Sequence, residues 1–405
     1  MNNASLELGG TNWAEKDASL LGYTVSDDSG RFYPQEFTFS RGSNLAATRI
    51  GKTGLIEKGR ENLLLQSNSF DTWAFTGGSS VTANQAGYDG TNDAWLLTDS
   101  GATASYGIYR NFNDVGVLTS SIYAKAASTN EIELDFYGDI FPYVRVDLTT
   151  GAITNTASHI DAQSVNIGNG WWRISVTGNL SSTSYVRIGC NGAGSIYIQD
   201  AQVEQGLAAS PYIPTTTTTA QAGVANPYLL LEPSRTNLVT NSEYIPSFSI
   251  GGSAIISLAN VINPQGTLSS YQVTSTSNGS RIQQNIGQQG NNFVYSGFFK
   301  GTGVATRLRI GNNLGNEIRY DIDANGIFTI QTTTSTNYGI EDYGNGWHRI
   351  YFETTTSSAA NNFLQVYPDS NDGNGSIYVW GLQAEEGTYP TSYIPTYSVS
   401  ATRAY

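Results

Sequence analysis

The stretch GNGWWRISV, residues Gly168 to Val176, returns later in the chain as GNGWHRIYF, residues Gly344 to Phe352. In each copy a Gly-Asn-Gly turn is followed by residues that alternate in character, and this period of two is typical of a β-strand with one buried face. Neither copy contains an obvious catalytic group. We therefore interpret the phrase as a structural element, and its recurrence predicts that one domain occurs twice.

Four other landmarks recur in the same order, at offsets between 175 and 181 residues. They are EKGRENLLLQS (Glu57–Ser67) with EPSRTNLVTNS (Glu232–Ser242), SIYAK (Ser121–Lys125) with SGFFK (Ser296–Lys300), GSIYIQDAQVEQG (from Gly194) with GSIYVWGLQAEEG (from Gly375), and YIPT at Tyr212–Thr215 and Tyr393–Thr396. We therefore predict a tandem duplication, with an N-terminal docking segment at 1–56, repeats at 57–216 and 232–397, a linker at 217–231 and a tail at 398–405. The phrase Ala47-Thr48-Arg49 returns as Ala401-Thr402-Arg403 and suggests a short docking strand beside each unit.

The composition favours strands over helices. The chain of 405 residues has 44 glycines, 25 tyrosines and 12% aromatic residues, and such chains form short strands joined by polar turns. The predicted fold class is all-β, with two tandem antiparallel β-sandwich domains of the jelly-roll type behind the N-terminal segment. The stretch from Asn12 to Leu21 is the one place where we expect a short helix.

Charge and cysteine content exclude several classes of partner. The 33 acidic and 20 basic residues give a net charge of −13, which disfavours nucleic acid and anionic membranes. The N-terminus has no signal-peptide pattern and the chain has no apolar run of membrane-spanning length, so we expect synthesis in a cytoplasm. A single cysteine, Cys190, excludes an internal disulfide framework, which leaves burial, sheet closure, metal or oligomerisation as sources of stability.

The landmarks together resemble a known family of domains. The order R-x-N-L, S-x-x-x-K, G-N-G-W-x-R-I, Y-I/V-x-x-x-Q-x-E-x-G and Y-I-P-T is similar to the carbohydrate-binding-like sandwich domains in virion proteins of tailed bacteriophages. The phrases FSRGSNLAATR at Phe39 and LLLEPSRTNL at Leu229 resemble the stretches that introduce such domains. The resemblance covers about Phe39 to Arg403 and identifies no particular glycan.

This resemblance implies a virion component, as a fibre, tail or head-decoration protein assembled in the host cytoplasm and exposed on the particle. We expect it to dock on other virion proteins and to adhere to bacterial surface glycans without catalysis. The resemblance also implies a homo-oligomer, with a trimer favoured, and burial of aromatic residues between copies would stabilise a chain without disulfides. Two alternatives stay open: a purely structural capsid or tail component without ligand binding, and a glycan depolymerase that uses Glu131 and Glu133.

The repeated phrase offers one candidate glycan-binding pair in each copy. Trp171 and Arg173 share one face of their strand, and Trp347 and Arg349 take the corresponding places in the second copy. An aromatic plane beside a bidentate donor suits a pyranose ring and its hydroxyls. The alternative, which we favour, is a structural contact in which the tryptophan covers the sheet and the guanidinium stacks on an aromatic ring.

A second candidate is a row of charges. Glu131, Glu133 and Asp135 alternate with apolar residues and so line one face of a strand, whereas the matching strand carries Arg307 and Arg309. Glycoside hydrolases of the concanavalin-like class use a row in the order Glu, Asp, Glu, from which this order departs. We therefore favour a solvated or subunit-contact face, then pairing between the two rows, and catalysis last.

Evidence for metals and cofactors is weak. The loop at Asp369–Gly373 lacks the glycine and glutamate of a calcium-binding EF-hand loop, so we interpret it as a turn. Acidic loops with Asp89, Asp93 and Asp139 leave a structural calcium open. We expect no cofactor.

Overall fold

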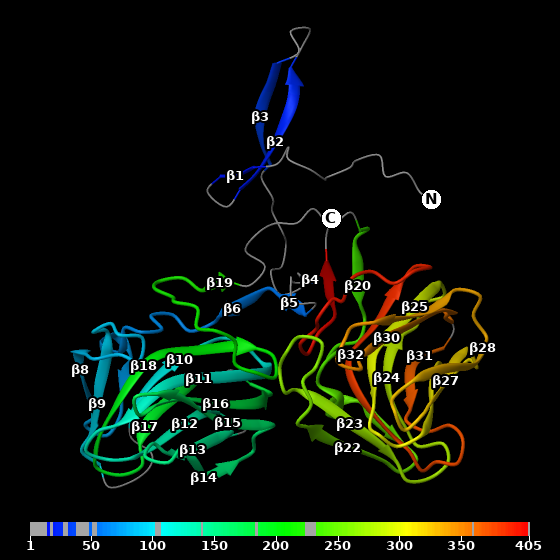
Figure 1. The fold of residues 1–405 in the computed structure, drawn as a ribbon. Helices are drawn as coiled ribbons and strands as arrows, with labels where there is room; N and C mark the ends of the chain where they lie inside the picture. The colour runs from blue at the N-terminus through cyan, green and yellow to red at the C-terminus, as the bar shows by residue number, and fades with distance from the viewer. Residues whose placement is uncertain are drawn as a thin grey trace.

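The computed structural model describes residues 14–16, 19–26, 31–37, 48–50, 55–101, 107–138, 141–182, 185–222, 232–358 and 360–403. In these ranges the chain consists of strands and two short 3-10 helices, η2 (Phe70–Thr72) and η3 (Ile245–Ser247). The all-β fold class is confirmed. Figure 1 shows two lobes side by side: module 1 (described residues of 59–222, blue to green) and module 2 (232–403, green to red).

Module 1 is a sandwich of two six-stranded antiparallel sheets. We call the sheet that contains the repeated phrase the tryptophan sheet, and the sheet that contains Glu131 the charged sheet. The tryptophan sheet has the order β15-β16-β11-β18-β9-β8, with β8 (Ser80–Gln85), β9 (Ala94–Asp99), β11 (Gly116–Ala126), β15 (Asp161–Gly168), β16 (Trp171–Leu180) and β18 (Gly194–Gln205). The charged sheet has the order β14-β13-β12-β17-β10-β7, with β7 (Ala74–Phe75), β10 (Ile108–Asn111), β12 (Glu131–Tyr137), β13 (Tyr143–Asp147), β14 (Ala152–Ala157) and β17 (Tyr185–Cys190).

Module 2 repeats this topology strand for strand. Its tryptophan sheet has the order β22-β23-β32-β25-β30-β29, with β22 (Ala254–Ala259), β23 (Ser270–Ser275), β25 (Asn292–Gly301), β29 (Tyr338–Asp342), β30 (His348–Thr355) and β32 (Ser376–Glu386). Its charged sheet has the order β21-β24-β31-β26-β27-β28, with β21 (Ser249–Gly251), β24 (Arg281–Gly287), β26 (Thr306–Gly311), β27 (Glu317–Ile322), β28 (Phe328–Thr333) and β31 (Asn362–Tyr367). The duplication predicted from the landmarks is therefore visible in the fold.

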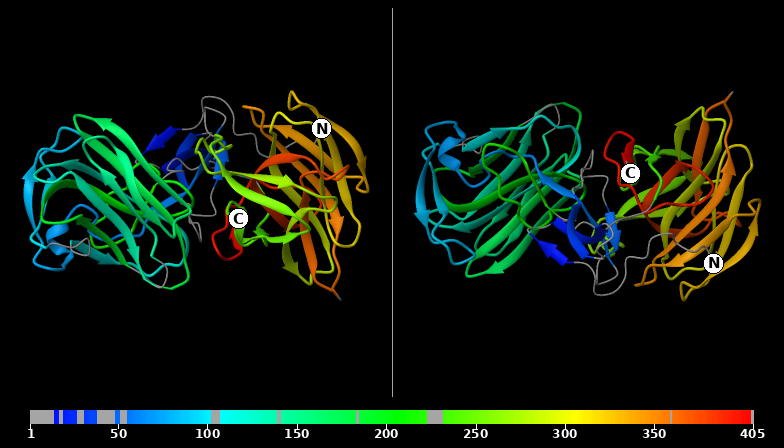
Figure 2. Two further views of the ribbon diagram at one scale, coloured as in Figure 1. Left: turned by 90° about the horizontal axis from the view of Figure 1, so that it is seen from below. Right: turned by 90° about the horizontal axis from the view of Figure 1, so that it is seen from above.

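Each sandwich encloses its own core, and Figure 2 shows the two layers of each lobe from below and above. The period of two decides which side chains enter it: in β12, Ile132, Leu134 and Phe136 are fully buried in the core of module 1. The core of module 2 is formed by its own strands and is joined by Val117 and Leu207 of module 1. The modules therefore touch but keep separate cores.

The repeated landmarks hold the ends of each module together. In module 1 the side chain of Asn62, from the R-x-N phrase, donates to Ile213 O at 2.8 Å and accepts from Val203 N at 3.1 Å. Asn237 makes the equivalent bonds in module 2, to Ile394 O at 2.8 Å and from Ala384 N at 3.1 Å. These asparagines are fully buried, and an unpaired buried amide would be costly. The asparagine therefore recurs in both copies because each module needs it to join the same two segments.

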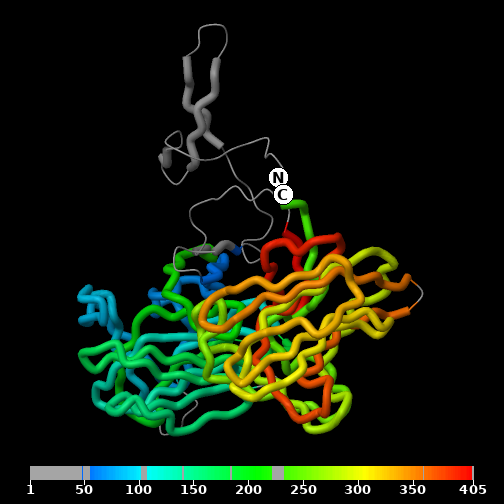
Figure 3. Tube along the Cα trace, turned by 45° about the vertical axis from the view of Figure 1, so that its right-hand side comes forward, coloured from blue at the N-terminus to red at the C-terminus, as the bar shows by residue number. Residues whose placement is uncertain are grey.

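Short strands close the modules. β6 (Arg60–Asn62) pairs with β19 (Ala220–Ala222), and β20 (Arg235–Asn237) pairs with β33 (Ala401–Arg403), which is the red C-terminal segment of Figure 3. The predicted linker and tail thus each contain a strand that pairs with the start of a module.

A third closing element precedes module 1 in the chain. β4 (Thr48–Ile50) pairs with β5 (Ile56–Lys58), and we call these two strands the strap. The strap lies on module 2, since Thr48 Oγ1 donates to Tyr393 O at 2.5 Å and Ile56 N donates to Pro264 O at 2.8 Å. The predicted boundary at residue 57 falls within β5.

Further upstream, β1 (Ala14–Lys16), β2 (Ser19–Ser26) and β3 (Arg31–Phe37) form a separate antiparallel sheet, which Figure 1 shows above the two lobes. The helix expected from Asn12 to Leu21 is therefore wrong, because the pairing of β2 with both neighbours outweighs a weak local preference.

Candidate functional site

The two tryptophan–arginine pairs are structural elements. Trp171 and Trp347 are 2% and 1% exposed, and the Trp347 indole donates to Ile262 O at 2.7 Å. Arg349 donates to Thr391 O at 2.7 Å and lies 5.7 Å from the centroid of Phe298, and Arg173 contacts Ser210 O in the same way. Neither tryptophan offers an exposed ring face to a sugar, because each is buried in an aromatic cluster that includes Tyr88 and Tyr212 in module 1 and Ile56 and Tyr393 in module 2. The structural alternative therefore describes all four residues.

The two charge rows occupy equivalent strands, β12 and β26, and their ion pairs are formed within their own sheets. Glu133 accepts from Arg145 Nε at 2.6 Å and from Arg187 at 3.2 Å, and Asp135 accepts from Arg187 Nε at 2.8 Å. In module 2, Arg307 pairs with Asp321 at 2.6 Å and Arg309 with Glu317 at 2.5 Å. The row of Glu131, Glu133 and Asp135 thus does not pair with the row of Arg307 and Arg309, because the neighbouring strands supply the partners.

The outer face of the charged sheet of module 1 gathers five aromatic rings. We call this set the aromatic face; it consists of Tyr109, Tyr137, Phe141, Tyr143 and Tyr185. Tyr137 and Tyr185 are cross-strand partners whose rings stack at 4.9 Å, and Tyr109 lies 4.7 Å from Tyr185. Phe141 lies 5.5 Å from both Tyr137 and Tyr143. Alternation along each strand places these rings opposite the core.

The aromatic face surrounds a fixed arginine. The guanidinium of Arg187 lies 5.3 Å from the ring centroid of Tyr137 and 5.5 Å from that of Phe141, while Asp135 and Glu133 hold it from below. Burial raises the pKa of Asp135 to about 8, although Arg187 opposes the shift. The Oδ1 atom of Asp135 is buried without a hydrogen-bond partner among the described residues. The polar groups are thus held in place beneath rings that reach solvent, with Tyr137 46% exposed.

Module 2 has a different surface at the same place. The register puts Gln283, Gln365 and Glu317 where module 1 has Tyr109, Arg187 and Tyr143. Phe363 stands where module 1 has Tyr185, and the second aromatic residue here, Tyr367, is only 8% exposed because the guanidinium of Arg309 lies 4.3 Å above it. The aromatic face is therefore a property of module 1.

Sequence reasoning missed the aromatic face although part of the signal was present. Tyr137 continues the alternation of Glu131, Glu133 and Asp135 by one step, which indicated an aromatic residue on the charged face. Tyr109 and Tyr185 come from strands whose neighbours depend on sheet order, and sheet order cannot be read from spacing.

The calcium prediction stays untested. In the described part of the chain, no three acidic, histidine or cysteine side chains lie close enough together to hold a metal ion. Asp89 and Asp93 accept hydrogen bonds from Thr91 and Gln199, and Asp139 lies outside the described residues.

No helix of the described residues is long and apolar enough to span a membrane.

The solved structures compared with this chain are distant from it in sequence. No family model and no curated protein matches the chain. Among solved structures, the chain is similar to the N-terminal CBM22-1-CBM22-2 tandem domain of Xyn10C from Paenibacillus barcinonensis, with 12% identity over 86% of this chain and 100% of that one and a TM-score of 0.30. It is also similar to the CBM22-1-GH10 modules of xylanase 10B from Clostridium thermocellum (18% identity, 36% of this chain and 27% of that one, TM-score 0.24).

A third neighbour is an exo-β-1,3-galactanase from Phanerochaete chrysosporium, with 9% identity over 90% of this chain and 75% of that one and a TM-score of 0.21. TM-scores this low do not establish a shared function. The argument for function therefore depends on the surfaces described above.

Proposed function

We propose that this chain is a non-catalytic glycan-binding protein and that the aromatic face of module 1 is its main binding surface. The observation that supports this best is the group of five rings around Arg187 on one open sheet face. Aromatic rings contact the apolar faces of sugars, and the buried guanidinium of Arg187 holds the rings of Tyr137 and Phe141 in place through cation–π contacts. Because the protein has a net charge of −13, neutral glycans fit better than acidic ones.

The test is binding of the full chain to an array of neutral glycans and to host surface polysaccharide, for the wild type and the Tyr137→Ala variant. Tyr137 is 46% exposed, so its removal leaves the core intact. We expect about 5- to 10-fold weaker binding, which corresponds to the loss of about 1–1.5 kcal/mol for one aromatic contact.

Tyr389→Ala is the matched control, since Tyr389 is also exposed (48%) but follows β32 of module 2, away from the aromatic face. Equal loss of binding in both variants, or unchanged affinity in Tyr137→Ala, would exclude the aromatic face as the binding surface.

We further propose that the protein belongs to a bacteriophage virion, as a fibre, tail or head-decoration protein. This depends on the sequence resemblance and on the repeated landmarks. Immunogold labelling of purified particles with an antibody against module 2 would test it. Absence of the protein from purified virions would contradict this proposal. If the protein is present but all of its described faces are buried against other virion chains, the purely structural role is favoured.

A homo-oligomer, with a trimer favoured, is part of the same proposal. Apolar residues are exposed at the same edge of both modules: Ile153, Val165 and Ile167 on β14 and β15, and Ile330, Tyr338 and Ile340 on β28 and β29. Burial of such edges between copies would stabilise the chain. Light scattering coupled to size exclusion should therefore give a mass above 43.5 kDa at micromolar concentration.

The depolymerase alternative has a simple test. Glu133 is 3% exposed and both of its carboxylate oxygens are paired with arginines, Arg145 and Arg187, so the carboxylate is not open to a substrate. We expect no release of reducing sugar from host polysaccharide. Release that disappears in Glu131→Gln/Glu133→Gln would overturn the non-catalytic proposal.

A further inference from the structure

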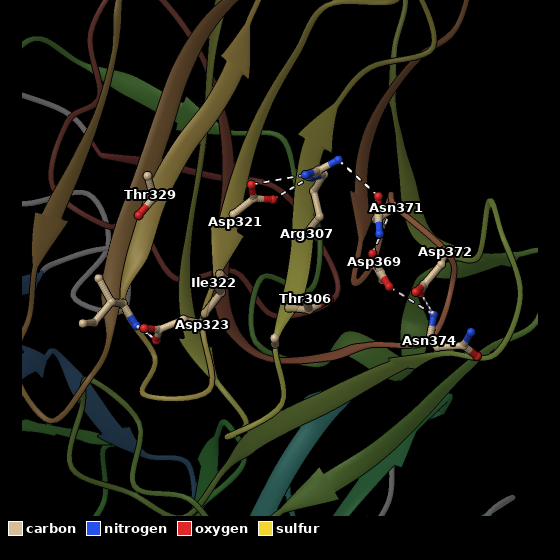
Figure 4. A pocket seen from close by; sticks show the side chains of 12 residues that line it. Thr306, Arg307, Asp321, Ile322, Asp323, Thr329, Asp369, Asn371, Asp372 and Asn374 are labelled. Atoms are coloured by element: carbon tan, nitrogen blue, oxygen red, sulfur yellow. Dashed lines mark hydrogen bonds and ion pairs between the residues drawn. The ribbon is translucent and has the colours of Figure 1, made fainter.

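Module 2 contains a polar hollow of about 460 Å³ at one end of its charged sheet. Figure 4 shows its two walls, with Arg307 of β26 between them. The lining comes from β26, β27, the start of β28 and the connection between β31 and β32; it includes Thr306, Arg307, Asp321, Asp323, Thr329, Asp369, Asn371, Asp372 and Asn374. The volume lies in the range of small-ligand sites.

The first wall is the connection Pro368–Gly375, and it is fixed from within. Asp369, 3% exposed, accepts from Asn371 N at 2.8 Å and from Asn374 N at 3.1 Å. The strand below holds the same connection, since Thr306 Oγ1 donates to Pro368 O at 2.7 Å. The side chains of Asn371 and Asn374 are thus presented from a loop that needs little further ordering.

The second wall is the turn between β27 and β28. Asp323 accepts from Asn325 N at 2.8 Å and from Ile327 N at 2.9 Å. Arg307 joins the walls, because it bonds to both carboxylate oxygens of Asp321, at 2.6 and 3.2 Å, and to Asn371 Oδ1 at 3.2 Å. A rigid polar site of this kind loses little entropy when it binds a ligand.

The hollow depends on a segment that the duplicated module lacks. In module 1 the connection from β17 to β18 is only Asn191–Ala193, and Asn191 bonds directly to Glu131, which stands at the position of Arg307. The longer connection in module 2 is also where the offset between the repeats grows to 181 residues. Loops added to a rigid scaffold are common places for binding sites.

We propose that this hollow is a second glycan site, separate from the aromatic face, which takes the end of a neutral sugar chain. Four aspartates and one arginine line it, so an acidic sugar would be repelled. Asp323, Asp369 and Asp372 each accept hydrogen bonds from backbone N–H groups of their own turns, and Asp321 is paired with Arg307. The Asn374 amide and the Thr329 hydroxyl are left for ligand hydroxyls. The side chain of Ile327, 60% exposed, provides an apolar contact for a sugar face.

The experiment uses the full chain with the Tyr137→Ala change, so that binding at the aromatic face is reduced, on an array of neutral and acidic glycans. We expect residual binding to neutral glycans only. Thr329→Trp places a large ring in the hollow from an exposed position and should weaken that binding at least tenfold, as should Asn371→Ala/Asn374→Ala. Asn325→Ala, an exposed amide next to the hollow, is the control and should bind normally.

Three results would overturn the proposal: no residual binding by the Tyr137→Ala chain, residual binding that Thr329→Trp leaves unchanged, or calorimetric binding of CaCl₂ that is lost in Asn371→Ala/Asn374→Ala while no neutral glycan binds. The two glycan proposals fail independently. Binding that is insensitive to Tyr137→Ala but abolished by Thr329→Trp would remove the aromatic face and keep the hollow.

Discussion

The two modules cover the same tryptophan in different ways. In module 1, Trp171 packs with Tyr123, and the ring of Tyr88 from the same module stacks on Tyr123 at 3.9 Å. In module 2 the corresponding cluster of Phe298, Trp347, Trp380 and Tyr393 is completed by Ile56 of the strap, which precedes module 1 in the chain. Module 1 therefore closes itself, whereas module 2 needs a distant segment.

The two modules also differ at one position next to these tryptophan clusters, which is Asp200 in module 1 and Gly381 in module 2. Asp200 in module 1 has a φ of 59° and accepts from the hydroxyl of Tyr88 at 2.9 Å. Gly381 has the same conformation in module 2, with a φ of 60°, and has no side chain there. A Cβ at Gly381 would come within 2.9 Å of the Phe298 ring, so the aromatic cluster fills that space instead. The two modules thus share the backbone conformation at this position, but different side chains pack over the tryptophan in each.

The largest expected effect comes from Lys58, which ties the strap to module 2. Lys58 Nζ lies 2.5 Å from Glu243 Oε1, and the two side chains are 5% and 3% exposed. Lys58→Met should lower the free energy of unfolding by about 3–5 kcal/mol, because it leaves a buried carboxylate without its charge partner. Urea denaturation followed by tryptophan fluorescence measures this.

The control is Lys58→Met/Glu243→Gln, which removes both charges and should recover most of the loss. If Lys58→Met alone lowers the free energy of unfolding by less than about 1 kcal/mol, the Lys58–Glu243 ion pair does not stabilise the contact between the strap and module 2.

Much of this comparison was accessible from the sequence, including a short docking strand at Ala47-Thr48-Arg49, where β4 lies (Thr48–Ile50), but not the module that the strap contacts. The repeated landmarks gave the duplication, and the period of two placed Glu133 and Arg309 on equivalent outward positions. The partners of these charges are set by strand order, which spacing does not encode. The packing of Ile56 into the cluster that contains Trp347 joins segments far apart in the chain through a single short strand, which is too brief for a periodic pattern.

The next effect in size tests the strap through its apolar contact. Ile56 is 2% exposed, and Ile56→Ala should cost about 2–4 kcal/mol by opening a cavity beside Trp380, whereas Ile56→Val should cost about 1 kcal/mol. Thermal unfolding of both variants, with hydrogen exchange at Trp347 and Trp380 to localise the change, provides the measurement. Loss of protection at Trp171 instead would show that the strap covers the other module.

Asp200 should make the stability of module 1 depend on pH. Burial raises the pKa of this carboxyl to about 7, above its unfolded value, so the folded state holds the proton more tightly. Its contribution is fully present below about pH 4 and is lost as the pH rises through about 7, and a pKa about three units above the unfolded value corresponds to a loss of at most about 4 kcal/mol over that range. In Asp200→Asn this part of the pH dependence should vanish, as denaturation curves at pH 4.5, 6 and 7.5 would show. An unchanged profile would mean that Asp200 stays ionised in the fold.

The smallest effect concerns the hydroxyl of Tyr88. Tyr88→Phe keeps the ring stacked on Tyr123 and removes only the hydrogen bond to Asp200, so we expect a cost of about 1 kcal/mol at pH 7.5. Because that bond favours the ionised carboxylate, its loss should move the midpoint of the pH-dependent stability change upward. The same denaturation series measures both effects. Module 2 has Gly381 in place of Asp200 and no equivalent bond, so its unfolding transition should not move in Tyr88→Phe. A shift of that transition would show that the stabilities of the two modules are coupled.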